Sequence, residues 1–280
     1  MARPSRNFTE PLLKLRSLLF RRFESRPFQF SIVLWRRFPP RCNLPAMELT
    51  AVTYNTYRER AGRDPLLKCL MREPEALLCL QEVSPARALG MCSSLGRRVF
   101  LTPVKHGVQF LVLVIPEGAR FLERRVVHLN SRGGLLPEPW CLRRGMNLRR
   151  AGTRGWTDAL EPRAVQVACV AWRGRAMQVA NTHLPYEPGL RRRCYTPLEG
   201  ALDLEDAILA GDFNAVPEDL FFSDFLRATG LVSAGDPGPT HGGRRIDHIL
   251  FRGRFRALGC GVERGRSDHL LVRSRLEVLP

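Results

Sequence analysis

The chain has 280 residues, 44% of them hydrophobic, which is enough for one large domain or two small ones with a buried core. Its formal net charge of +17 favours anionic partners, namely nucleic acid, phosphate-bearing small molecules or anionic lipid headgroups. The sequence argues against a zinc ribbon, because its eight cysteines form no C-x-x-C pair, and against a transmembrane segment, because charged residues interrupt the apolar runs before they reach about 18 residues.

Residues 1–46 differ from the rest of the chain, because they hold ten basic and two acidic residues, a net charge of +8 that leaves +9 for the remainder. This segment is a basic arm for nucleic acid or membrane, a transit-like peptide, or a stretch that is not translated because synthesis begins at Met47. We favour the last interpretation. The expected organisation is a basic extension over 1–46, disordered or not translated, followed by one domain over 47–280.

From Met47 onward, strands and helices alternate. Runs rich in Val, Leu and Ile predict strands; these lie at 49–55, 75–83, 108–116, 163–172, 176–184, in the second part of 201–214, and at 245–253 and 270–278. Helical spacing with start and stop signals predicts helices; these lie at 63–74, 84–95 and 217–231. A further helix is expected to run into the strand that ends at 214. The short "RGR" after Trp172 predicts a hairpin, and 130–160 predicts a long surface loop.

Several of these strands end in polar residues. The polar residues at strand ends are Asn55, Glu82, His183, Asp212, Asn214, Asp247, His248, Asp268 and His269. In a layered α/β fold, the ends of neighbouring strands converge on one cleft. In "ILAGDFNAVP", strand alternation would direct Asp212 and Asn214 to the same side, although an Asx-type turn explains the same letters.

The chemistry of these side chains fits metal-assisted phosphoryl transfer. Mg²⁺ prefers oxygen ligands and keeps several waters, so one or two carboxylates suffice to hold it. A further carboxylate can deprotonate an attacking water, and histidines can stabilise charge on the phosphate or protonate a leaving oxygen. A zinc site is disfavoured, because few imidazoles accompany so many oxygen donors.

Six motifs, in this order, resemble the endonuclease/exonuclease/phosphatase superfamily: "TYN", "LQEV", "NTHL", "GDFNAVP", "IDHIL" and "SDHLLV". The resemblance covers about residues 47–278. It implies the deoxyribonuclease I-like fold, a four-layered α/β sandwich of two packed mixed sheets flanked by helices. It also implies hydrolysis of phosphoester bonds with Mg²⁺ or Mn²⁺ as the cofactor.

The resemblance also assigns expected roles to individual residues. The metal ligands would be Asn55, Glu82 and Asp268. Asp212 would orient or deprotonate the water, and Asn214 would hold the phosphate. His183 would be the general acid, while Asp247 would hold His269 against the scissile phosphate.

Other residues fit the family pattern less directly. Many members carry a substrate-contacting arginine after a strand in the first half, and Arg163 is the candidate here. The stretch between His183 and Asp212 reads as a short basic loop in place of a longer helix. His248 is expected to be structural, His241 to be a turn residue in a loop, and Tyr54 to belong to the core or to the wall of the cleft.

Three functions remain open from the sequence. The leading one is a nuclease that cleaves DNA or RNA, because arginines cluster at 191–193 and at 143–150 and would contact phosphates, with Trp140 and Trp156 available for stacking. The alternative is a phosphatase or phospholipase C-type hydrolase of small or lipid phosphates, such as phosphoinositides or sphingomyelin. The third is a non-catalytic basic nucleic-acid-binding protein.

The abundance of arginine qualifies the argument from charge. Arginine supplies 41 of the 44 basic residues, a ratio that a GC-rich genome produces as easily as phosphate binding does. Cys79 and Cys169 lie in apolar strand-like runs, which predicts buried free thiols and a reducing, cytoplasmic location. We also expect a monomer.

Overall fold

The computed structural model describes residues 47–57, 64–104, 109–130 and 161–279, which belong to one compact unit, Arg41–Pro280. The predicted basic extension over 1–46 lies outside the described residues. So does nearly all of the predicted surface loop, including its arginines at 143–150, Trp140 and Trp156.

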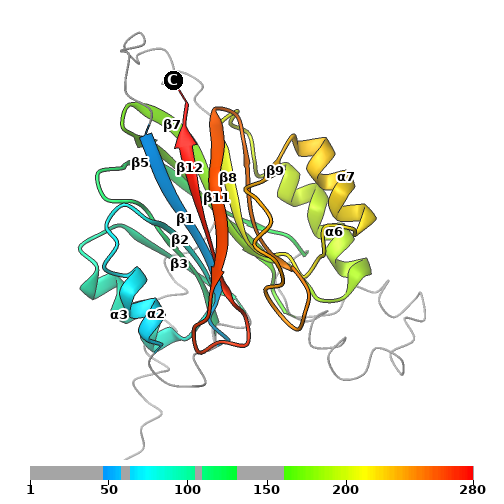
Figure 1. Cartoon of the computed structure of the whole chain (residues 1–280), viewed down its shortest axis with the longest axis horizontal. Coiled ribbons are helices and arrows are strands. Elements are labelled where there is room, and N and C mark those ends of the chain that lie inside the picture. Colours follow the sequence, from blue (N-terminus) through cyan, green and yellow to red (C-terminus); the bar gives the residue numbers. More distant parts are fainter. Residues whose placement is uncertain (1–46, 58–63, 105–108, 131–160, 280) are drawn as a thin grey trace, which may run out of the picture. The chain divides into compact units, whose positions relative to one another are not determined.

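The described residues form two six-stranded sheets that pack face to face (Figure 1). The first has the order β11-β12-β1-β2-β4-β3 and contains β1 (Met47–Asn55), β2 (Leu77–Val83), β3 (Val99–Val104), β4 (Gln109–Val114), β11 (Phe255–Glu263) and β12 (Leu271–Val278). The second has the order β5-β6-β7-β8-β10-β9 and contains β5 (Arg120–His128), β6 (Ala164–Trp172), β7 (Arg175–His183), β8 (Ala207–Asp212), β9 (Val232–Ser233) and β10 (Asp247–Arg252). Both sheets are mixed, because β1 runs parallel to β2 and β7 runs parallel to β8.

Helices cover the outer face of each sheet. Helices α2 (Pro65–Leu70) and α3 (Pro85–Ser94) pack on the first sheet, and α6 (Pro188–Glu199) and α7 (Leu220–Thr229) pack on the second (Figure 1). The four-layered α/β sandwich implied by the sequence resemblance is therefore confirmed. No helix in the described part of the chain is both long and apolar enough to span a bilayer.

The space between the sheets is filled by the alternate, inward-facing residues of the strands. In β1 these are Leu49 and Ala51, and in β8 they are Ile208 and Ala210. The same rows become polar toward one end of the sandwich. Their last inward-facing members are Asn55 in β1, His183 in β7 and Asp212 in β8, while Asp247 begins the row in β10. The apolar core thus leads directly into a buried polar cluster.

Local turn chemistry explains how several strands and helices begin and end. The β6–β7 hairpin turns through Arg173 (φ 49°) and Gly174 (φ 84°), the two positive angles of a type I′ turn. Helix α7 begins at the cap Asp219 and ends at Gly230, whose φ of 68° is left-handed. Ser84 precedes α3, as expected, but its side chain makes no capping hydrogen bond.

The stretch between His183 and Asp212 corrects the sequence prediction, because it contains helix α6 rather than a basic loop. Leu190, Cys194 and Leu198 recur every four residues and are buried against the second sheet. Glu187 caps the helix by accepting a 2.6 Å hydrogen bond from the Leu190 amide. The expected helix running into β8 is absent from this described segment, since the residues between Gly200 and Ala207 are turns and bends.

Candidate active site

Three of the predicted site residues form one row across the second sheet. His183 is the register partner of Asp212 between β7 and β8, and Asp247 is the register partner of Asp212 between β8 and β10. Strand pairing therefore places an imidazole and a second carboxylate on either side of Asp212, which is itself only 1% exposed.

The Oδ2 atom of Asp212 is the centre of this arrangement. It accepts a 3.0 Å hydrogen bond from Asn55 Nδ2, which comes from the other sheet. His183 Nε2 lies 3.5 Å from this oxygen and His269 Nε2 lies 3.8 Å from it. His269 in turn is held by Asp247, whose Oδ2 is 2.9 Å from His269 Nδ1. Residues separated by up to 214 positions thus meet around one carboxylate oxygen.

The electrostatics of the cluster follow from burial and from like charges. Burial raises the pKa of Asp212, and the nearby Asp247 carboxylate raises it further, against the lowering effects of His269 and Asn55. Burial lowers the pKa of His269, but its hydrogen bond to Asp247 and the charges of Asp247 and Asp212 outweigh this and raise it to about 9. His269 is therefore held as a cation beside Asp212 at neutral pH.

The turn after β8 differs from the predicted alternation. β8 ends at Asp212, and Asn214 has a φ of 51°, so Asn214 does not continue the strand. Its amide donates to Asp212 Oδ1 at 2.9 Å, which is an Asx-type turn, and its side-chain Nδ2 donates to the carbonyl of Leu184 at 2.9 Å. Gly211 is required here, because a Cβ would clash with the Thr182 carbonyl of β7.

Glu82 is presented by a β-bulge. The register between β2 and β4 shifts between Leu80 and Val83, and Glu82 has a φ of 53°. Bulges re-aim side chains and occur often beside active sites. The Glu82 carboxylate accepts a 2.7 Å hydrogen bond from Gln109 Nε2 at the start of β4. Gln109 was not singled out from the sequence, since only the fold brings it to Glu82.

Asn181 of the second sheet holds this bulge in place. Its Nδ2 donates to the carbonyls of Leu80 and Val112, both at 3.0 Å, and its Oδ1 accepts from Gln81 Nε2 at 2.7 Å. Asn181 and Gln81 are completely buried. A buried and satisfied polar network of this kind fixes one arrangement of the strands that carry Glu82 and His183.

Ser267 links the backbone of Asn55 to the side chain of Asp268, two of the predicted metal ligands. Its hydroxyl lies 2.7 Å from the Asn55 carbonyl, to which it donates, and 3.3 Å from Asp268 Oδ1. The Asp268 side chain is 41% exposed and faces His241, whose Nδ1 is 4.0 Å from Asp268 Oδ2. The His241 ring stacks on His269 with centroids 4.2 Å apart, so His241 is part of the site and not only a turn residue.

Two groups in the described chain could hold a metal ion: Asp212 with Asp247 and His269, and Asp268 with His241 and His269. The predicted ligands Asn55, Glu82 and Asp268 offer amide and carboxylate oxygens, which is the donor type that Mg²⁺ and Mn²⁺ take. Among the described residues, Glu82 Oε1 accepts no hydrogen bond, which leaves a donor oxygen for a cation. The residues present therefore fit a hard divalent ion.

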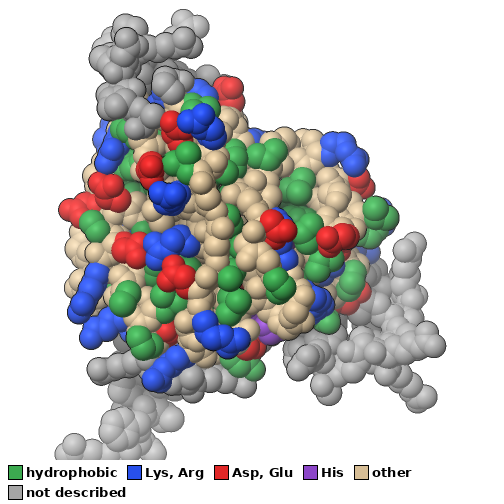
Figure 2. Space-filling model, in the orientation of Figure 1, with side chains coloured by type: hydrophobic (Ala, Val, Ile, Leu, Met, Phe, Trp, Pro, Cys, Tyr) green, Lys and Arg blue, Asp and Glu red, His purple; other side chains and the backbone are tan. Residues whose placement is uncertain are grey.

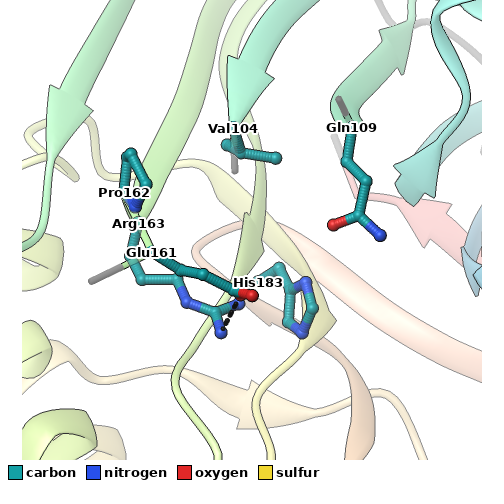
Figure 3. A pocket seen from close by; sticks show the side chains of 6 residues that line it. All are labelled: Val104, Gln109, Glu161, Pro162, Arg163 and His183. Carbon is teal, nitrogen blue, oxygen red and sulfur yellow. Dashed lines mark hydrogen bonds and ion pairs between the residues drawn. The ribbon is translucent and has the colours of Figure 1, made fainter. Parts of the chain in front are cut away.

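Arg163 lies beside His183 in a small pocket (Figure 3). Its guanidinium is paired with Glu161, with 2.9 Å between the charged atoms, and both side chains are nearly buried. Gln109 also lines the pocket, and the His183 ring lies between Gln109 and the ion pair. The pocket therefore connects the predicted general acid with the residue that holds Glu82.

A family model described as "Endonuclease/Exonuclease/phosphatase family" matches residues 52–269. The chain belongs to the endonuclease/exonuclease/phosphatase family. The members of this family are generally phosphoester hydrolases. No curated protein matches the chain in sequence.

Solved structures agree with this assignment at the level of the fold. A family member from Bacteroides vulgatus is 15% identical with a TM-score of 0.63, and the match covers 83% of this chain and 99% of that one. The mannosyl-6-phosphatase of Bacteroides thetaiotaomicron is 16% identical with a TM-score of 0.61, covering 81% and 99%. TDP2 of D. rerio, complexed with single-strand DNA product, is 14% identical with a TM-score of 0.59, covering 82% and 98%.

The charge distribution differs in two respects from the prediction that clustered arginines contact phosphates. Arg191 is 6% exposed and forms a 2.7 Å ion pair with Asp219, so it supports the fold and does not face a substrate. On the face seen in Figure 2, basic and acidic side chains are interspersed.

His248 is structural, as expected. It points away from the row formed by His183, Asp212 and Asp247, and its ring centroid lies 4.7 Å from that of Phe222. Its Nε2 lies 2.8 Å from the Ala215 carbonyl, and burial lowers its pKa to about 4. The unfolded chain, with an ordinary histidine pKa of 6.5, therefore binds this proton first as pH falls.

We expect the chain to lose stability through His248 between pH 6.5 and pH 4. The free energy of unfolding is measured with urea at pH 7.5 and at pH 5.0, for the unsubstituted chain and for His248→Gln. Between these two pH values it should fall by about 2 kcal/mol more in the unsubstituted chain than in the variant. Glutamine can still donate to Ala215 but does not titrate. Equal losses in the two proteins would contradict the prediction.

Proposed function

We propose that this chain is a divalent-metal-dependent phosphoesterase, and that it cleaves phosphodiester bonds of DNA or RNA by attack of water on phosphorus. The observation that carries the proposal is the convergence of Asn55, His183 and His269 on Asp212 Oδ2. A carboxylate with a raised pKa, flanked by the imidazoles of His183 and the cationic His269, supplies the base, acid and charge stabilisation that hydrolysis of a phosphoester needs.

Each residue has a defined task in this proposal. Asp212 accepts the proton of the attacking water at Oδ2 while Asn55 holds that oxygen in place. His269, kept cationic and oriented by Asp247, donates from Nε2 to a phosphate oxygen and stabilises its growing charge. His183 donates a proton to the leaving oxygen, and Asn214 holds the phosphate from the turn after β8.

Asn55, Glu82 and Asp268 would hold the divalent ion in this proposal. When bound, the ion supplies charge neutralisation on the phosphate and on the leaving oxygen. Gln109 orients Glu82 by a hydrogen bond to its carboxylate. Asn181 orients it indirectly, by holding the bulge in β2.

A phosphatase of small polar phosphate esters is the second candidate. The pocket beside His183 favours it, because Gln109, Glu161 and Arg163 surround the position next to the general acid with hydrogen-bonding groups. Such a pocket suits a hydroxylated leaving group. The similarity in fold to a mannosyl-6-phosphatase agrees with this candidate but does not distinguish it from a nuclease.

The two candidates are tested with the full chain. We expect nicking of supercoiled plasmid and cleavage of oligonucleotides with Mg²⁺ or Mn²⁺, loss of both in EDTA, and recovery when metal is restored. The rate of nucleic-acid cleavage should fall steeply with salt, whereas turnover of a small phosphate ester should not. Metal-dependent turnover of sugar phosphates without nicking would favour the phosphatase. No turnover of either substrate with either metal would overturn the proposal.

A further inference from the structure

Two arginine–aromatic pairs lie exposed near the site. The Arg192 guanidinium carbon is 4.4 Å from the centre of the Phe221 ring, and that of Arg244 is 5.6 Å from the centre of the Tyr186 ring. Tyr186 is 52% exposed and Phe221 is 40% exposed, so both side chains are accessible to a ligand. We refer to these four residues as the arginine–aromatic rim.

The rim adjoins both halves of the candidate site. Tyr186 follows His183 by three residues. Arg244 is paired through its backbone with His241, and the His241 ring stacks on His269. Between His241 and Arg244, Gly242 (φ 54°) and Gly243 (φ 75°) form a two-residue turn. Both positions of this turn are left-handed, which suits glycine. This tight turn holds Arg244 at the edge of the site.

The two aromatic residues are attached to one framework. The buried guanidinium of Arg191 donates to the Tyr186 carbonyl at 2.9 Å and to Asp219 Oδ2 at 2.7 Å. Asp219 caps α7 by accepting from the Phe221 amide at 3.0 Å. The backbones of Tyr186 and Phe221 are therefore tied to each other through the buried side chain of Arg191 and its partner Asp219.

The two arginines of the rim are not neutralised by a described carboxylate. In the described part of the chain, no carboxylate forms an ion pair with Arg192 or Arg244, whereas the adjacent Arg191 pairs with Asp219. A guanidinium that lies over a ring keeps its N–H groups available at the edge for a phosphate. The rim thus presents unneutralised cations next to aromatic faces.

We propose that the arginine–aromatic rim binds single-stranded nucleic acid, with unpaired bases stacked on Tyr186 and Phe221 and backbone phosphates on Arg192 and Arg244. Stacking requires base faces that a duplex keeps covered. A small phosphate ester has no base to stack on an aromatic ring, so the two rings of the rim would add nothing to its binding. The inference rests on the proposed function, because it names the form of substrate that the same site receives.

The test measures binding without turnover. The full chain carrying Asp212→Asn is titrated in EDTA with a fluorescein-labelled single-stranded oligonucleotide, and the Kd is read from anisotropy. Adding Tyr186→Ala or Phe221→Ala should weaken binding about tenfold each. Leu258→Ala, on β11 at 37% exposure, is the matched control and should leave the Kd unchanged. Thermal midpoints verify that all variants are folded.

Salt and competing ligands complete the test. Arg192→Gln and Arg244→Gln should each reduce the slope of log Kd against log salt by about 0.7. A duplex of the same sequence should bind more weakly. An unchanged Kd in Tyr186→Ala and Phe221→Ala would overturn the proposal that the rim binds single-stranded nucleic acid. The proposal would also be overturned if the chain bound no oligonucleotide and these substitutions instead weakened its binding to anionic lipid vesicles. If the rim substitutions weaken oligonucleotide binding but the unsubstituted chain turns over no phosphoester, the proposed function would be overturned instead.

Discussion

Asp212→Asn is expected to reduce metal-dependent phosphodiester hydrolysis about a thousandfold while the chain stays folded. The substitution removes the carboxylate whose Oδ2 atom faces Asn55, His183 and His269 together, and general-base catalysis contributes on the order of 10² to 10⁴ in rate. Folding should be retained, because asparagine has the same shape and removes one of two adjacent buried carboxylates. The measurement is kcat for bis(p-nitrophenyl) phosphate together with the thermal midpoint.

The control for Asp212→Asn is the same chemical change at an exposed position. Asp224→Asn on α7 alters a side chain that is 65% exposed and paired only with Arg227. Its kcat should equal that of the unsubstituted chain. If Asp212→Asn retained more than about a tenth of the activity, the carboxylate would not be the base and its assigned role would be wrong.

Asp247→Asn is expected to have the second largest effect, a fall in kcat of about a hundredfold. Asp247 holds His269 Nδ1 and is the main cause of the raised pKa of that imidazole. Without the carboxylate, its raising effect is lost while the lowering effect of burial remains, so the pKa of His269 falls from about 9. A smaller fraction of His269 would then be cationic at pH 7.5, and less charge stabilisation would reach the phosphate.

Two readouts separate this positioning role from simple destabilisation. The pKa of His269, followed by NMR through its Cε1 proton, should shift downward in Asp247→Asn. Asp206→Asn is the matched control, because Asp206 is also buried and salt-bridged but lies at the other end of β8. It should reduce stability without moving the His269 titration. An unshifted His269 pKa in Asp247→Asn would show that Asp247 does not govern the imidazole.

The sequence pattern identified the strands that lie inside the sheets and missed those at the edges. All eight predicted strands have two neighbours, whereas β3, β5, β9 and β11, which were not predicted, each have one. An edge strand has less need of a continuous apolar run. In β5 the sequence "RFLERRVVH" alternates between exposed and half-buried residues, and β3 carries Pro103, which an edge strand tolerates.

Motifs predicted which residues line the site but not how they are held. Asp212, His183, His269 and Asn55 meet as expected, because polar residues at the ends of paired strands lie together once the sheets form. Gln109 and Asn181 carried no signal of their own. Their partners are 27 to 101 residues away, and only the bulge in β2 and the packing of the two sheets bring them into contact.

The change from an apolar to a polar interior along the sandwich has a consequence for how the two sheets are aligned. At the end away from the site, the sheets are held by hydrocarbon contacts such as those of Leu49, Trp172 and Leu276. At the site end they are held by amide hydrogen bonds between Gln81, Asn181 and the strand backbones. Hydrocarbon contacts are non-directional, whereas hydrogen bonds require defined geometry. The register of one sheet against the other is therefore set most strictly at the end that carries the candidate site.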